Sequence, residues 1–215
     1  MSGCGVQDGS EIHEAVSAMI GVSMTGAQYK CFAPNIPYRH VINHAKGEVA
    51  QGESRNVLVE SARISRGDIT DLSQLDSTKF DALIIPGGYG AAKNLCDFAE
   101  KQADFTINPD LVKVMKDFHS EKKPIGLCCI SPVIAAKVFP GSSVTIGSDE
   151  GTAKAITALS SKNVPKKVDE VHIDKVNLLI TTPAYMAPDP PIHKVYEGVV
   201  KMVKNVLQLT KEEEF

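Results

Sequence analysis

The chain has 215 residues, of which 43% are hydrophobic and 23% charged, and its formal net charge is −3. This balance is typical of a globular protein long enough to bury a core. Neither a basic cluster nor an aromatic-basic stripe is present, so the charge pattern excludes a nucleic acid or a membrane surface as the expected partner. No apolar run approaches the roughly 18 residues that a transmembrane helix needs.

Hydrophobic periodicity and turn residues predict helices and strands that alternate along the chain. The first element is a helix from about Glu11 to Thr25, and the residues expected to form its apolar face are Ile12, Ala15, Val16, Met19 and Ile20. The predicted strands cover 28–33, 80–85, 124–128, 143–146, 168–173 and 178–182. The other predicted helices cover 53–65, 91–98, 109–121, 152–159 and 191–209, with one more opened by Pro132. Residues 35–52 are predicted to form a long loop.

Strands separated by helices predict an α/β fold with a mostly parallel sheet that helices cover on both faces. No internal repeat or low-complexity segment divides the chain, so we expect residues 1–215 to form one domain. In such sheets ligands bind beyond the carboxyl ends of the strands. Two glycine- or cysteine-bearing turns of this sequence fall there, and both are candidate sites.

The strongest local signal is the stretch from Lys123 to Pro132, where a short apolar strand is followed at once by a helix. Cys129 lies on the turn, which is the arrangement of a nucleophile elbow. A thiol at a helix N-terminus is expected to ionise more readily than a free thiol. The alternative is that Cys128 and Cys129 are both small buried hydrophobic residues, as free cysteines often are.

The second signal is the strand that runs into Pro86-Gly87-Gly88. Glycines let backbone N–H groups approach a ligand closely, which favours an anion or oxyanion pocket. The alternative is an ordinary tight turn. Lys93 stands where a dinucleotide-binding fingerprint requires its third glycine or alanine, so that motif is excluded.

The third signal is the acidic start of the first helix, where Ser10 or Asp8 is expected to cap the helix. Helical projection places Glu14 roughly opposite the apolar face, which by itself predicts a solvent-exposed side chain.

The chain has five cysteines, two of them adjacent, and no secretory leader opens it. An odd number without a leader predicts free thiols in a reducing, intracellular compartment, either the cytoplasm or the mitochondrial matrix. There is no CxxC pair and no Cys/His cluster with zinc spacing, so we expect no metal.

Six motifs in order resemble the enhancing lycopene biosynthesis (ElbB-like) glyoxalases, also described as glutamine amidotransferase-like class 1 domain proteins. The wider group is the PfpI and parkinsonism-associated deglycase superfamily. The matching stretches are SGCGV (2–6), DGSEIHE (8–14), ESRNVL (53–58), PGGYGAAKNL (86–95), GLCCISP (126–132) and TTPAYM (181–186).

This resemblance implies a flavodoxin-like three-layer sandwich in a single amidotransferase-like (PfpI-type) domain. It selects Cys129 over Cys128 as the elbow cysteine and places the Glu14 carboxyl group on its thiol. It also implies backbone donors for an oxyanion at Gly87, Gly88 and Ile130.

The sequence departs from related enzymes at Gly147-Ser148, where superfamily relatives carry a histidine. A glutaminase triad is therefore not expected, and an amidotransferase activity is disfavoured.

The leading hypothesis is a cofactor-free, glyoxalase-type lyase that converts small 2-oxoaldehydes such as glyoxal to hydroxy acids through the Cys129 thiolate, with slow turnover. The alternative is a non-catalytic, redox-responsive or metabolite-binding protein that uses the same pocket. The expected partners are a small-molecule aldehyde and, as one option, a second copy of the chain in a homodimer.

Only ten residues precede the first predicted helix, whereas relatives place an apolar strand directly before the segment that matches Ser2 to Gly5. Met1 stands in its place. We therefore expect the first strand of the sheet to be truncated here, which leaves neighbouring strands in need of another hydrogen-bonding partner.

Overall fold

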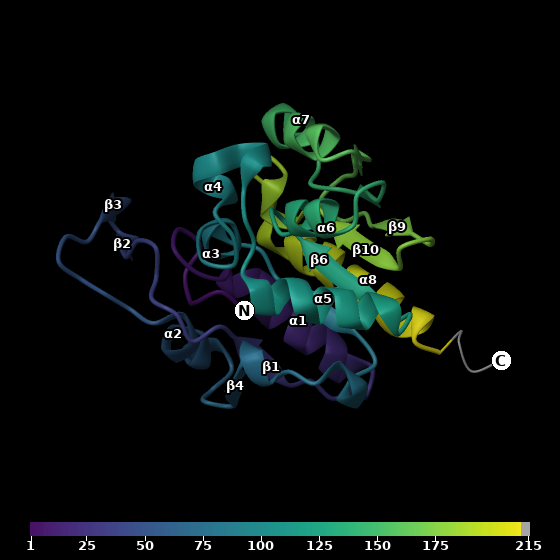
Figure 1. The fold of residues 1–215 in the computed structure, drawn as a ribbon, viewed down its shortest axis with the longest axis horizontal. Helices are drawn as coiled ribbons and strands as arrows, with labels where there is room; N and C mark the ends of the chain where they lie inside the picture. Colours follow the sequence, from purple (N-terminus) through teal and green to yellow (C-terminus); the bar gives the residue numbers. More distant parts are fainter. Residues whose placement is uncertain (212–215) are drawn as a thin grey trace.

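The computed structural model describes residues 1–211, in which helices cover both faces of a central sheet (Figure 1). Four strands form this sheet in the order β5-β6-β10-β9, and β9 is the antiparallel member. The α/β class with a mostly parallel sheet, expected from the sequence, is confirmed. Its strands are β5 (Leu83–Ile85), β6 (Ile125–Cys128), β9 (His172–Asp174) and β10 (Leu179–Thr182).

Three two-stranded sheets accompany the central one. The largest is parallel and pairs β1 (Cys31–Ala33) with β4 (Ile69–Asp71). The others pair β2 (Ile42–Asn43) with β3 (Glu48–Val49), and β7 (Ser143–Val144) with β8 (Lys162–Asn163). The expected loop over 35–52 therefore contains a short hairpin, and the short strands β4 and β8 were not predicted.

Eight α-helices are present within the described residues. They are α1 (Ile12–Met24), α2 (Val57–Ile64), α3 (Tyr89–Lys93), α4 (Phe98–Lys101), α5 (Pro109–Ser120), α6 (Pro132–Val138), α7 (Glu150–Ala158) and α8 (Ile192–Leu209). The predicted helices are confirmed to within a few residues, except that the expected 91–98 segment is divided between α3 and α4. No helix among residues 1–211 is both long and apolar enough to cross a membrane.

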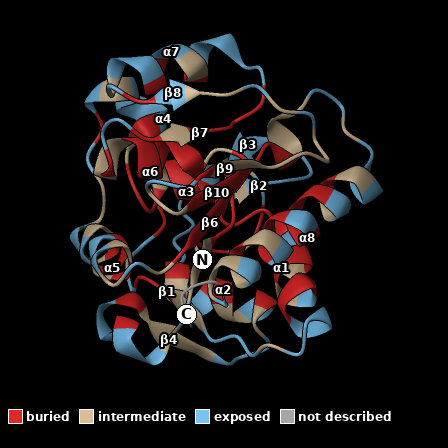
Figure 2. Cartoon of the chain, turned by 90° about the vertical axis from the view of Figure 1, so that its right-hand side faces the viewer, coloured by how far each residue is buried: buried red, intermediate tan, exposed pale blue. Residues whose placement is uncertain are grey.

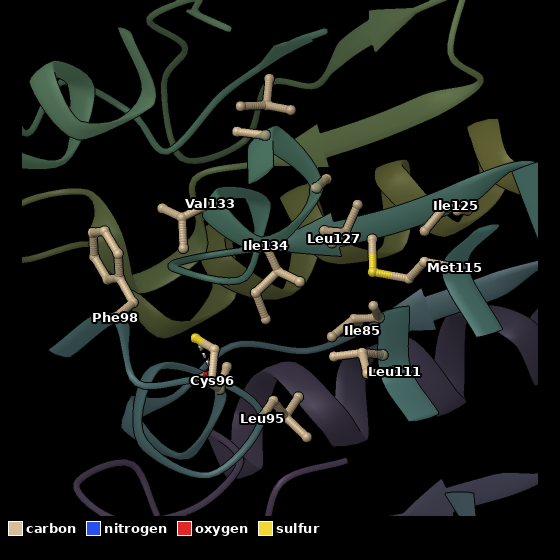
Figure 3. Close-up of a cluster of buried hydrophobic side chains, with 14 of the residues drawn as sticks. Ile85, Leu95, Cys96, Phe98, Leu111, Met115, Ile125, Leu127, Val133 and Ile134 are labelled. Carbon is tan, nitrogen blue, oxygen red and sulfur yellow. Dashed lines mark hydrogen bonds between the residues drawn. The ribbon is translucent and has the colours of Figure 1, made fainter. Parts of the chain in front are cut away.

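Two hydrophobic clusters hold the layers together. One joins α5 and α6 to the sheet through residues such as Met115, Ile134 and Leu127 (Figure 3). The other joins α1 and α8 to the opposite side through Val22, Val203 and Ile180. Every residue of β6 and β10 is buried, because both faces of these strands are covered (Figure 2). Neither strand contains a charged residue, in keeping with that burial.

The expected apolar face of α1 is only partly right, because Ala15 is buried but Ile12 and Ile20 are not. Ile12 and Ile20 are each 41% exposed, whereas the buried side of the helix consists of Glu14, Ala15, Ser17, Ala18, Gly21 and Val22. Small residues allow α1 to approach α8 closely: a Cβ added at Gly21 would lie 3.2 Å from the Cβ of Val203. The orientation of α1 therefore depends on the close packing of small side chains, and it does not follow from side-chain hydrophobicity alone.

Residues 1–11 fold into a loop, in which Cys4 and Ser10 form a single β-bridge. The loop is held to the rest of the fold by side chains such as Asn94, whose Nδ2 donates to the carbonyl oxygens of Ser2 and Asp8. This loop leads directly into α1 and therefore sets the position of Glu14.

Candidate active site

Cys129 lies on a strained turn between β6 and α6. Its φ is +60°, in the left-handed region that residues with a side chain rarely occupy. The backbone N–H of Cys129 donates to Thr182 O at 3.1 Å, and the Oγ of Ser131 accepts the N–H of Cys128 at 3.1 Å. These bonds fix the turn in the conformation of a nucleophile elbow.

Glu14 is fully buried, although helical projection predicted solvent exposure. Its Oε2 accepts the N–H of Gly87 at 2.9 Å, and its Oε1 accepts the N–H of Tyr185 at 3.3 Å. The projection was wrong because these donors come from loops distant in sequence, which satisfy a carboxyl group on the packed side of the helix. The N-cap is Glu11, whose Oε2 accepts the N–H of Glu14 at 2.8 Å, and neither Ser10 nor Asp8 caps the helix.

The Glu14 carboxyl group lies against both adjacent thiols. Cys128 Sγ donates to Glu14 Oε2 at 3.6 Å, and the Cys129 thiol also interacts with this carboxyl group. A Cβ added at Gly87 would lie 2.4 Å from the Cβ of Cys129 and 2.6 Å from Glu14 Oε2, so the three residues surround one small space. The backbone N–H groups of Gly88 and Ile130 are directed at the Cys129 sulfur.

Burial dominates the electrostatics of this group. It raises the pKa of Glu14 to about 7, with a further contribution from Glu11. Burial and the neighbouring Glu14 carboxylate raise the pKa of both Cys128 and Cys129 well above that of a free thiol. The expected readily ionised thiolate is therefore corrected: desolvation outweighs the start of the short helix α6. Near neutral pH the thiols are protonated, and Glu14 is the member of the group that titrates.

The candidate oxyanion donors do not all have the same function. The N–H of Gly87 is engaged by Glu14, so it positions that carboxyl group instead of facing a substrate oxygen. The donors directed at the sulfur are those of Gly88 and Ile130. Gly88 has a φ of +94°, and a Cβ there would lie 2.3 Å from the backbone nitrogen of Glu11, so only glycine fits this turn.

Sequence reasoning assigned no role to Tyr185 and His13, which meet beside Glu14. His13 Nδ1 lies 2.6 Å from the hydroxyl of Tyr185, whose backbone nitrogen donates to the Glu14 carboxyl group. Burial and the nearby charges of Glu11 and Glu14 raise the pKa of Tyr185. The sequence offered one signal for this pair, which is that His13 directly precedes Glu14. Helical spacing alone does not predict the contact between His13 and Tyr185.

The backbone of Gly147 has a φ of +83°. A Cβ at this position would lie 3.3 Å from the Cβ of Pro183. Pro183 directly precedes the 3₁₀ turn Ala184–Met186, which carries Tyr185. The Gly147 loop therefore packs against the segment that supplies one of the two backbone donors to Glu14.

Comparison with known proteins identifies close relatives over almost the whole chain, although no family model matches. The chain is 50% identical over 219 residues to the mitochondrial ES1 protein homolog of Rattus norvegicus, covering 98% of this chain and 82% of that protein. It is also 50% identical to the human mitochondrial glutamine amidotransferase-like class 1 domain-containing protein 3, covering 98% and 81% of the two chains.

Solved structures agree with this relationship. An isoprenoid biosynthesis protein with an amidotransferase-like domain from Ehrlichia chaffeensis superposes with a TM-score of 0.89 at 37% identity, covering 96% of each chain. Drosophila melanogaster DJ-1beta superposes with a TM-score of 0.55 at 17% identity, covering 96% of this chain and 92% of that one, which supports the fold alone. The expected flavodoxin-like fold is thereby confirmed.

Proposed function

Because the chain belongs to the family of ES1 and glutamine amidotransferase-like class 1 domain-containing proteins, we propose that it is a cofactor-free glyoxalase-type enzyme. Its substrates are small 2-oxoaldehydes, glyoxal foremost, and its products are hydroxy acids. The observation that carries the proposal is the buried Glu14 carboxyl group, with a pKa near 7, against a cysteine on a strained elbow. Perturbed acids beside a nucleophile are typical of catalytic sites.

The first step is addition of the Cys129 sulfur to one aldehyde carbon. Because the thiol is protonated, the ionised Glu14 carboxylate takes its proton as the carbon–sulfur bond forms. The carbonyl π electrons move to the aldehyde oxygen, which the N–H groups of Gly88 and Ile130 stabilise. The proton held by Glu14 then passes to that oxygen and gives a neutral hemithioacetal.

The second step is an internal oxidation and reduction of the two substrate carbons. Glu14 removes the hydrogen of the sulfur-bearing carbon as a proton and passes it to the second carbonyl oxygen, so that an enediol forms. Glu14 then takes the O–H proton of the sulfur-bearing carbon and returns it to the other carbon, which gives a hydroxyacyl thioester. Water then cleaves the carbon–sulfur bond, which releases glycolate and restores the thiol. Glyoxal plus water equals glycolic acid, so no external oxidant or reductant takes part.

The crowding of the site supports a small substrate. Cys129 is only 7% exposed, and Gly87 and Gly88 leave no room for a Cβ. Glyoxal consists of two carbonyl groups with no further substituent, so it needs less space than any other 2-oxoaldehyde. The relatives' names place them in mitochondria, and we propose the mitochondrial matrix for this chain as well.

The redox-responsive alternative is less well supported. Oxidation by peroxide requires thiolate character and access to solvent. Cys128 and Cys129 are buried, and their pKa values are raised.

The test is incubation of the purified protein with glyoxal, followed by NMR detection of glycolate. Cys129→Ser should abolish glycolate formation, because a serine hydroxyl is a much weaker nucleophile. Cys96→Ser is the matched control, since Cys96 is buried in a separate cluster of the core. Equal glycolate production by Cys129→Ser and the unsubstituted protein would contradict the proposal.

A further inference from the structure

A polar cavity lies between the loop of residues 1–11 and the segment that contains the β2–β3 hairpin. Its volume is about 280 Å³, and its lining includes Asp8, His44, Glu53 and Arg55. The hairpin extends away from the central sheet (Figure 1). None of the residues assigned to the proposed mechanism lines this cavity, so it is a separate feature of the fold.

Asp8 contributes a buried carboxyl group to this cavity. The residue is 3% exposed, and its Oδ2 accepts the backbone N–H of Ile42 at 2.8 Å. Its Oδ1 is also buried, and it has no hydrogen-bond partner among the described residues. A buried acceptor without a donor is unfavourable, so a donor from outside the chain is expected at this oxygen.

His44 is the candidate donor within the chain, with its Nε2 3.8 Å from Asp8 Oδ1. This nitrogen accepts the backbone N–H of Gln7 at 3.1 Å, so it carries no proton. The other ring nitrogen, Nδ1, lies 3.1 Å from the carbonyl oxygen of Ile42, which is an acceptor only. The ring proton is therefore on Nδ1, and this neutral tautomer of His44 donates nothing to Asp8.

The backbone around Asp8 keeps the carboxyl group in place. Asn94 Nδ2 donates to the Asp8 carbonyl oxygen at 2.8 Å, and the Asp8 N–H donates to Gly5 O at 3.4 Å. Gly5 has a φ of +125°, and a Cβ there would lie 2.7 Å from His44 Nε2 and 3.1 Å from Asp8 Oδ1. Glycine therefore leaves the space beside the unpartnered oxygen clear.

The charges around the cavity favour a cation. Two cations act on Asp8, but both have other partners: Arg55 lies 3.4 Å from the carboxyl groups of Glu53 and Glu60, and Lys93 donates to a backbone carbonyl oxygen. Burial raises the pKa of Asp8, as expected of a carboxylate that lacks sufficient compensation. A ligand that carries both a positive charge and N–H donors supplies what Asp8 lacks.

We propose that this cavity is a binding site for a small primary amine, whose ammonium group donates a hydrogen bond to Asp8 Oδ1. Because this oxygen is covered, we expect the half-exposed side chain of His44 to turn outward on binding. No group of three or more His, Cys, Asp or Glu side chains within residues 1–211 is arranged to hold a metal ion, which favours an organic cation. The inference does not depend on the proposed activity.

The probe is methylammonium, titrated into the full chain at constant ionic strength and about pH 8, where a carboxylate is ionised and a primary amine is protonated. Tetramethylammonium is the control probe, because it has the same charge and no N–H donor. The amide NMR resonances of Gln7 and Ile42 should shift saturably with methylammonium only. If neither shifts, or if both probes act equally, the cavity holds water or collects cations nonspecifically, and the proposal is overturned.

Asp8→Asn should weaken the affinity for methylammonium about tenfold or more, because it removes the charge and retains an oxygen for the N–H of Ile42. Glu48→Gln is the matched control, since it removes the same charge from an exposed position on β3 that does not line the cavity. This control should bind as the unsubstituted protein does. Undiminished affinity in Asp8→Asn would refute the assignment of Asp8 as the acceptor.

Arg55→Gln provides a test that does not depend on the folding of Asp8→Asn. The substitution removes a cation from the cavity, whereas Glu60 keeps its ion pair with Arg63 at 2.7 Å. Affinity for methylammonium should rise about twofold or more, because the repulsion between two cations is removed. Unchanged or weaker binding in the folded variant would place the ammonium group elsewhere and would also overturn the proposal.

Discussion

The carboxyl group of Glu14 accepts the backbone N–H of Gly87 at 2.9 Å, although the two residues are 73 positions apart in the sequence. This bond ties the first turn of α1 to the loop after β5. It also directs the carboxyl group at the thiols that follow β6. The alignment of the Glu14 carboxyl group with the thiols therefore depends on the loop that leads into α1, the loop after β5 and the turn after β6.

Replacing Gly87 should disrupt this alignment. In Gly87→Ala the new Cβ would lie 2.4 Å from the Cβ of Cys129, so the elbow or the Glu14 carboxyl group must move. We expect a loss of about 1–3 kcal/mol in the free energy of unfolding and a large loss of glyoxal turnover. Thermal denaturation and the NMR assay measure the two effects.

Gly151→Ala is the matched control, because a Cβ there would contact Asp149 Oδ1 at an ordinary 3.6 Å. This substitution in α7 should leave turnover unchanged and stabilise the fold by up to about 1 kcal/mol. Full activity in Gly87→Ala would show that the close approach of Gly87 to Cys129 and Glu14 is not needed for turnover.

Glu14 should make the stability of the protein depend on pH. Its pKa is raised from 4.5 to about 7, so between these pH values the folded chain retains a proton that the unfolded chain has released. The free energy of unfolding therefore falls as the pH rises from about 4.5 to 7, by about 3 kcal/mol from this group.

Chemical denaturation of the unsubstituted protein and Glu14→Gln across this range isolates the effect. Asp8 also has a raised pKa, and the comparison removes its contribution because both proteins contain it. Glu14→Gln should have the flatter profile. Identical slopes would show that Glu14 is not held protonated in the fold.

Cysteine reactivity should follow exposure. Cys4 and Cys31 are partly exposed, whereas Cys128 and Cys129 are buried with raised pKa values. Limiting iodoacetamide at neutral pH should therefore modify Cys4 or Cys31 before Cys129, as mass spectrometry can determine. Preferential labelling of Cys129 would instead indicate a preformed thiolate, with the proton on Glu14.

Much of the fold was predictable because the helices and buried strands are marked by local patterns. Pro132 and the apolar run before it predict the elbow, and the structure adds the positive φ of Cys129. The burial of the elbow thiol was not predictable from the turn, because Cys129 belongs to a hydrophobic cluster whose other buried members come mostly from α1 and α8.

Glu14 shows the other limit of sequence reasoning. Periodicity predicts an exposed side chain, and only the resemblance placed Glu14 near the thiol. Its burial depends on backbone donors from Gly87 and Tyr185, and no local pattern encodes these long-range contacts. The short strands β4 and β8 were missed for a similar reason, since pairing with β1 and β7 defines them.

The most direct test of the central claim is the pH dependence of kcat/KM for glyoxal in the unsubstituted protein and in Glu14→Gln. If Glu14 is the base that accepts the thiol proton, activity should rise with pH to a plateau, with a midpoint near the Glu14 pKa of about 7. Glu14→Gln should lose this rise together with about 100-fold or more of kcat/KM. A rise that begins only in the alkaline range of a raised thiol pKa, unchanged in Glu14→Gln, would contradict the account.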